Sequence, residues 1–61
     1  MPVTHFYGPG LTKEKKEELV RDFSAAASRA TGIPVEKMVV YVHEMNPENI
    51  GVGGDLLANR K

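Results

Sequence analysis

The sequence predicts an α+β fold in which two parallel strands flank one helix and a short hairpin follows towards the C-terminal end. Three observations predict it. Stretches rich in β-branched and aromatic residues lie at residues 3–7 and 38–45, and a helical pattern separates them over residues 12–32. A strand, a helix and a second strand in succession give a right-handed βαβ unit with a parallel pair of strands.

The first strand is expected at Val3–Tyr7, and the stretch GPG at residues 8–10 ends it. Pro2 stands directly before this strand and directly behind Met1. A sheet tolerates proline at the first residue of a strand, because the missing N–H is not needed there. If Met1 is removed, however, Pro2 carries a free secondary amine, and such an amine is a base.

The helix has clear signals at both ends. Thr12 is a candidate N-cap, Glu14 lies in the first turn, and Gly32 is placed as a C-terminal stop. Glu17 and Arg21 are spaced to pair, and the charged run KEKKEE at residues 13–18 is predicted to be a solvated face. Apolar residues recur at steps of three and four, which predicts a narrow stripe that docks on the sheet: Leu19, Phe23, Ala26, Ala27 and Ala30.

The second strand, MVVYVHEM, predicts association between chains. Met38, Val40 and Val42 face one way along it, and Val39 and Tyr41 face the other, so the strand is apolar on both sides. A strand of this kind needs cover on both faces of its sheet. The single helix covers one face. We therefore predict that other subunits cover the second face and that a neighbour extends the two-stranded sheet.

The composition narrows the range of functions. A chain of 61 residues is at the lower limit for independent folding, so residues 1–61 are predicted to form one domain. Eight basic and eight acidic residues cancel, which argues against a nucleic-acid partner. The sequence has no apolar run of roughly 18 residues and no signal-peptide pattern, which argues against a membrane partner. A cysteine-free chain of this kind fits the reducing cytoplasm best.

Four features together resemble the 4-oxalocrotonate tautomerase family over nearly the whole chain. They are Pro2 at the start of a strand, the helix EKKEELVRDFSAAASR, the ending VYVHEM, and GVGG at residues 51–54. The resemblance implies βαβ protomers that pair into four-stranded dimers, commonly within a homo-hexamer. It also implies keto–enol tautomerisation of a small 2-hydroxydienoate, enol or 2-keto acid, without metal or cofactor. The amine of Pro2 would be the general base and acid of that reaction.

The sequence departs from the better-known members of that family at three positions. Those members have arginine at the positions of Leu11 and Val39 and phenylalanine at the position of Ile50. Arginine holds carboxylates through two parallel hydrogen bonds, which leucine and valine cannot form. The resemblance therefore implies a more apolar substrate pocket and disfavours a dicarboxylate such as 2-hydroxymuconate. Arg60 is a candidate replacement cation, and a solvated terminal charge is the alternative for it.

His5 and His43 lack the spacing of a metal site, so structural roles are expected for them. Tyr7 and Tyr41 are expected to pack rather than to act as acids. A non-catalytic oligomeric scaffold with the same fold is the main alternative function. Addition of water to an unsaturated acid ranks lower, because no carboxylate is evidently placed to activate water.

Overall fold

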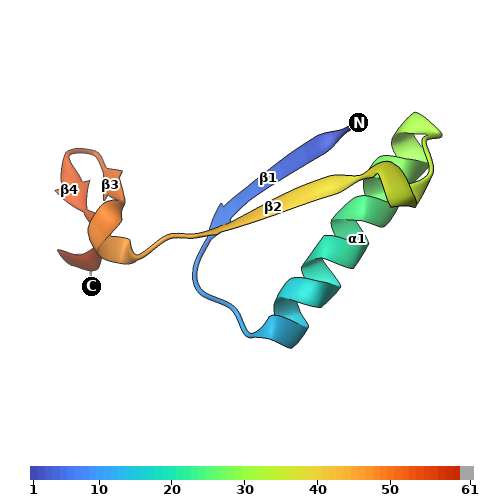
Figure 1. The fold of residues 1–61 in the computed structure, drawn as a ribbon. Coiled ribbons are helices and arrows are strands. Elements are labelled where there is room, and N and C mark those ends of the chain that lie inside the picture. Colours follow the sequence, from blue (N-terminus) through green and yellow to red (C-terminus); the bar gives the residue numbers. More distant parts are fainter. Residues whose placement is uncertain (60–61) are drawn as a thin grey trace.

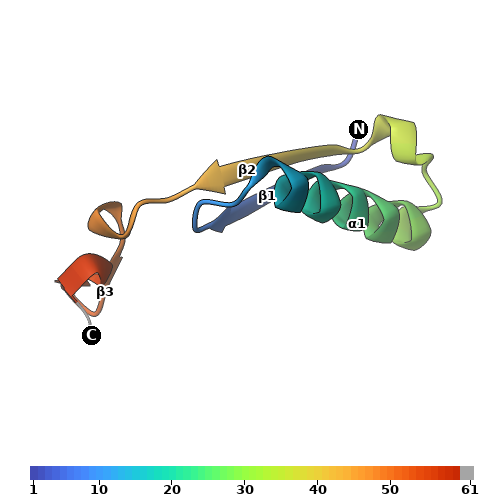
Figure 2. The same cartoon turned by 90° about the horizontal axis from the view of Figure 1, so that it is seen from below.

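The computed structural model describes residues 1–59 and contains the βαβ unit that the sequence predicts (Figure 1). Strand β1 (Val3–Gly8) and strand β2 (Val39–Glu44) are parallel, and helix α1 (Lys13–Thr31) connects them. The helix lies on one face of this two-stranded sheet and leaves the other face bare (Figure 2). The predicted α+β class is therefore confirmed.

The ladder between the strands runs from Val3 opposite Val39 to Gly8 opposite Glu44. Two further backbone bonds extend it, because the N–H of Val39 donates to the carbonyl of Pro2 (3.1 Å) and the N–H of Met45 donates to the carbonyl of Gly8 (2.7 Å). The second strand begins one residue later than predicted. Met38, the first residue of the predicted strand, instead caps the 3₁₀ turn η1 (Val35–Lys37) at its C-terminal end.

Both predicted ends of α1 are confirmed. The hydroxyl oxygen of Thr12 accepts a hydrogen bond from the N–H of Lys15 (3.2 Å), which satisfies a donor that the helix leaves free. Gly32 ends the helix in the left-handed conformation, with φ of 76°, and its N–H donates to the carbonyl of Ser28 (2.9 Å). The predicted pairing of Glu17 with Arg21 is wrong. Glu17 Oε1 instead lies 4.0 Å from Lys13 Nζ, one turn earlier in the helix.

The helix face that meets the sheet differs partly from the predicted stripe. Phe23 contacts Phe6 of β1, with ring centroids 5.8 Å apart. Ala26 and Ala30, however, are exposed, and Ser24 is the one buried residue among those that the structure describes. A small side chain lets the helix approach the sheet closely, and serine provides that as well as alanine does.

No apolar side chain in the described part of the chain is buried. Val3, Tyr7 and Tyr41 on the bare face of the sheet are 44%, 64% and 49% exposed. Burial of apolar surface is the main favourable term in folding, so a single copy lacks the core that a stable domain needs. The observation supports the predicted association of chains.

The C-terminal segment forms the predicted hairpin. After the 3₁₀ turn η2 (Pro47–Asn49), strands β3 (Gly51–Val52) and β4 (Asp55–Leu56) pair antiparallel, and η3 (Leu57–Asn59) follows. Gly53 and Gly54 make the turn with φ of 61° and 88°, values that glycine adopts without strain. The hairpin projects beyond the end of the β1–β2 sheet (Figure 1), and the molecule is 42 Å long.

Candidate active site

Pro2 is fixed at the N-terminal end of the sheet by its backbone. Its carbonyl accepts the hydrogen bond from the N–H of Val39, so the residue lies beside the start of β2. Pro2 and Val39 are both half-buried. Because proline within a chain has no N–H, its ring nitrogen takes no part in the ladder. The structure thus brings together two of the predicted site residues.

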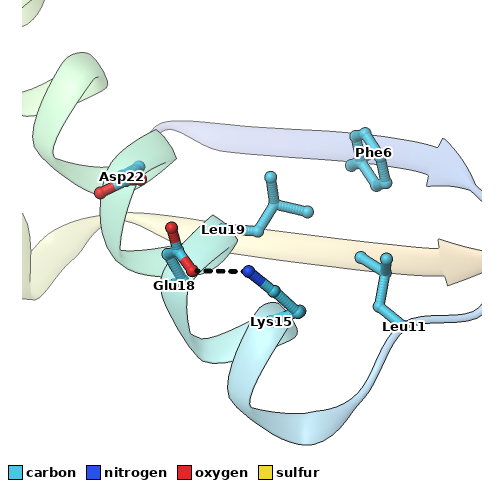
Figure 3. A pocket seen from close by; sticks show the side chains of 6 residues that line it. All are labelled: Phe6, Leu11, Lys15, Glu18, Leu19 and Asp22. Carbon is cyan, nitrogen blue, oxygen red and sulfur yellow. Dashed lines mark ion pairs between the residues drawn. The ribbon is translucent and has the colours of Figure 1, made fainter.

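Leu11 lies beyond the opposite end of β1, whose six residues span roughly 20 Å. It follows the loop after β1 and lines a groove of about 330 Å³ between that strand and α1 (Figure 3). The groove has an apolar floor and a charged rim, on which Lys15 Nζ lies 3.7 Å from Glu18 Oε2. Its lining residues are Phe6, Leu11, Lys15, Glu18, Leu19 and Asp22.

Ile50 is half-buried in a second hollow, of about 430 Å³, where the sheet meets the C-terminal segment. The residues around it come from the ends of β1 and β2 and from the start of the hairpin: Tyr7, Gly8, Met45, Asn49 and Gly51. The carbonyl of Ile50 accepts a hydrogen bond from the N–H of Leu57 (2.8 Å), which holds the hairpin against this residue.

Within one chain, the predicted site residues therefore fall into three places. Pro2 and Val39 share one end of the sheet, Leu11 lines the groove beside α1, and Ile50 lies at the hairpin. Arg60 is outside the described residues. A site that uses all the described ones requires surfaces from more than one copy of the chain.

The shortest side-chain hydrogen bond among the described residues joins α1 to the end of β2. Lys16 Nζ donates to Glu44 Oε1 at 2.6 Å. This hydrogen bond lowers the pKa of the Glu44 carboxyl below its ordinary value of 4.5, and the backbone N–H of Leu11 acts in the same direction. Glu44 thus ties both the first turns of α1, through Lys16, and the preceding loop, through the N–H of Leu11, to the sheet.

Sequence reasoning missed this contact. Lys16 belongs to the run that was predicted to be a solvated face, but its side chain is only 34% exposed. Lys16 precedes Leu19 by three residues and Val20 by four, which places it on the same side of α1 as these two apolar residues. This spacing is the sequence signal from which its position towards the sheet could have been predicted.

His5 and His43 lie together on the bare face of the sheet, as their positions in the two strands allow. In the part of the chain that the structure describes, no cluster combines three or more His, Cys, Asp or Glu side chains in a way that could hold a metal ion. No helix in that part is long and apolar enough to cross a membrane.

Comparison with known proteins decides the family. Residues 2–60 match the model of a family described as "Tautomerase enzyme". This chain belongs to the tautomerase family. The match begins at Pro2 and confirms the resemblance that the sequence features indicate.

Curated and solved relatives of this tautomerase agree. A 2-hydroxymuconate tautomerase of Pseudomonas fluorescens is 38% identical over 56 residues, which cover 90% of this chain and 89% of that protein. The crystal structure of YwhB, a homologue of 4-oxalocrotonate tautomerase, superposes with a TM-score of 0.91 at 31% identity, covering 98% and 100% of the two chains. A heterohexamer 4-oxalocrotonate tautomerase from Chloroflexus aurantiacus J-10-fl gives a TM-score of 0.84 at 30% identity, covering 100% and 98%.

Proposed function

We propose that this tautomerase-family isomerase interconverts the enol and keto forms of a small 2-hydroxydienoate, enol or 2-keto acid, with the amine of Pro2 as base and acid. The observation that carries the proposal is the placement of Pro2. It is half-buried, its carbonyl is fixed by β2, and its nitrogen takes no part in the sheet. Removal of Met1 is required, because the nitrogen of an internal proline is an amide and has no basic lone pair.

The reaction balances with this one group. The neutral amine takes the proton from the enol hydroxyl, and the O–H electron pair becomes part of the new carbonyl double bond. The electrons of the former C=C bond then take the proton from the prolinium nitrogen at carbon, which regenerates the neutral amine. The pyrrolidine ring restricts where the nitrogen can lie, so the amine serves both transfers when the two substrate atoms are within its reach.

Apolar surroundings help such a base. Removal of an amine from water disfavours its charged form, so a pocket built from Leu11, Val39 and Ile50 keeps the neutral form available. The same residues select the substrate. They offer no charged group for a second carboxylate, which favours a substrate with one carboxylate and an apolar remainder. We propose Arg60 as the cation for that carboxylate, with its guanidinium binding both oxygens.

Assembly completes the proposed pocket. In one chain the residues from β2, the helix groove and the hairpin are separate, so neighbouring copies must supply some of them. A related tautomerase is a heterohexamer, which supports a hexamer of identical chains here. Formation of the site and of the assembly would then be one event.

The test measures ketonisation of phenylenolpyruvate and 2-hydroxymuconate by absorbance, with protein whose intact mass shows Pro2 as the first residue. We expect turnover of both and a higher kcat/KM for phenylenolpyruvate, the monocarboxylate. Pro2→Ala removes the secondary amine and should lower kcat/KM by at least about a hundredfold.

Two further proteins serve as controls. A form with one extra residue before Pro2 has no basic nitrogen there and should show no turnover above buffer. Pro9→Ala changes a proline in the exposed loop after β1 and should retain the wild-type rate. Full activity of the extended form would overturn the role of Pro2, and no turnover of either substrate by the mature protein would favour a non-catalytic scaffold.

A further inference from the structure

Four aromatic side chains form a continuous stack on the bare face of the sheet. We refer to these residues as the imidazole–tyrosine face: His5, Tyr7, Tyr41 and His43. The rings of Tyr7 and His43 are stacked with centroids 4.3 Å apart, and those of His5 and Tyr41 are stacked at 5.0 Å. Helix α1 lies on the other side of the strands (Figure 2), so nothing in the described chain covers this stack.

The two imidazoles in the stack are hydrogen-bonded to each other. His5 Nδ1 and His43 Nε2 are 3.0 Å apart. One of these nitrogens must donate and the other must accept, and only a neutral imidazole can accept. The contact therefore exists when at least one ring is neutral. A second proton would turn it into two N–H groups and two positive charges pointing at each other.

Among the described residues, no carboxylate on this face offsets a second positive charge. The residues that face the pair from β1 and β2 are Tyr7, Tyr41, Val3 and Val39, which include no Asp, Glu, Lys or Arg. Glu44, the acid at the end of β2, is bound to Lys16 of α1, on the opposite side of the sheet. The doubly protonated pair is thus tolerated only where water reaches it.

A second copy of the chain fits this face best. A folded protein of 6.7 kDa is expected to expose roughly 3,900 Å², whereas this chain exposes 4783 Å². The excess over the whole chain, hairpin included, is roughly 900 Å², which is close to the area that one partner contributes to a standard interface. The face is aromatic and, with the imidazoles neutral, carries no charged side chain among the described residues, so two copies can stack on each other without charge repulsion.

We propose that the His5–His43 pair is a pH gate on assembly of this chain. The inference rests on the homo-oligomer of the proposed function and adds its regulation. In the assembled state the pair is covered and holds fewer protons, whereas in separated chains both rings are hydrated and can be protonated. Because the separated state binds more protons, acid favours it. The oligomer is stable at and above neutral pH and dissociates on acidification.

Sedimentation velocity at fixed protein concentration, from pH 8 to pH 5 with EDTA in every buffer, tests the gate. We expect the wild type to be assembled at pH 8 and to dissociate on acidification, with the dissociation constant rising about tenfold per pH unit for each proton taken up. His43→Gln keeps a polar partner for His5 and removes one titratable ring. This variant should remain assembled down to a pH at least one unit below the pH at which the wild type dissociates.

Tyr41→Phe is the matched control, because it keeps the stack and both imidazoles and should dissociate at the wild-type pH. The lower limit of pH 5 keeps the titration of Glu44 out of the range, since its pKa lies below 4.5. The gate is wrong if the wild type is monomeric at pH 8, if it stays assembled at pH 5, or if His43→Gln dissociates with the wild type.

If His43→Gln does not assemble at pH 8, His5→Gln replaces it. If neither variant assembles, the wild-type data decide, since a dissociation constant that does not change with pH overturns the gate. The readout is mass rather than turnover, so a failed gate leaves the role of Pro2 intact. The same titration with Pro2→Ala should match the wild type, whether or not Pro2 is the base.

Discussion

The two faces of the β1–β2 sheet differ in what covers them. One face is covered by α1 of the same chain, where Phe6 meets Phe23 and Lys16 binds Glu44. The other carries the imidazole–tyrosine face, which nothing in the described chain covers. The first face therefore depends on contacts within one chain. If other copies cover the second face, as proposed, its cover depends on their concentration.

Tyr41→Lys should have the largest effect, and it should act on assembly. It places an unpaired cation on the face that a second copy is proposed to cover, and an unpaired buried charge is strongly disfavoured. We expect the dissociation constant of the oligomer to rise by at least about a hundredfold, as measured by sedimentation equilibrium. Tyr41→Phe should change it little, and an unchanged constant for the lysine variant would show that this face is not the interface.

Phe23→Ala should lower the free energy of unfolding by about 2 kcal/mol, through lost contact between α1 and the sheet. This loss is smaller than for a fully buried phenylalanine, because Phe23 is half-buried. The loss belongs to each chain, so it should appear in urea unfolding at every protein concentration. Phe23→Leu restores most of the apolar contact with Phe6 and should recover most of the stability. A loss that disappears at high concentration would place Phe23 at a contact between chains instead.

Glu44→Gln should have the smallest effect on stability, and this effect should depend on pH. The folded state lowers the pKa of Glu44, so its contribution to stability is present above its ordinary value of 4.5 and is lost as pH falls through the lower folded value. The variant lacks this titration. Urea midpoints measured from pH 6 to pH 3 should converge for the two proteins as pH falls, and parallel curves would contradict the assignment.

Much of the fold follows from single residues whose chemistry is local. Thr12 specifies the start of the helix through its side-chain hydroxyl, which binds the N–H of Lys15. Gly32 and the glycines of the GVGG turn specify the helix end and the hairpin turn through their freedom to adopt positive φ. The exposed alanines and buried Ser24 were not predictable in this way, because hydrophobicity does not distinguish two small side chains on neighbouring faces of a helix. Lys16 and Glu44 are 28 residues apart, and only the packing of α1 on β2 brings them together.

The candidate site was predictable only in part for a different reason. Pro2 could be singled out because its chemistry follows from its position behind Met1. Val39 lies beside Pro2 within one chain, because the parallel pairing of β1 and β2 brings their first residues together. Leu11 and Ile50 lie elsewhere in the same chain, and the proposed pocket brings them to Pro2 only through the packing of copies. The sequence of one chain carries that information only indirectly, as apolar surface without cover. Order and spacing along the chain were enough to indicate the family, whereas they do not give the geometry of the proposed pocket.

The way in which Pro2 is held has a practical consequence for handling the protein. The sheet binds the carbonyl of Pro2 and not its nitrogen, and Met1 is 86% exposed. A purification tag or a retained methionine at this end would therefore leave the circular dichroism, the melting temperature and the number of chains per particle unchanged while abolishing the proposed chemistry. The mass of the intact chain, measured before any rate, distinguishes a competent preparation from a well-folded inert one.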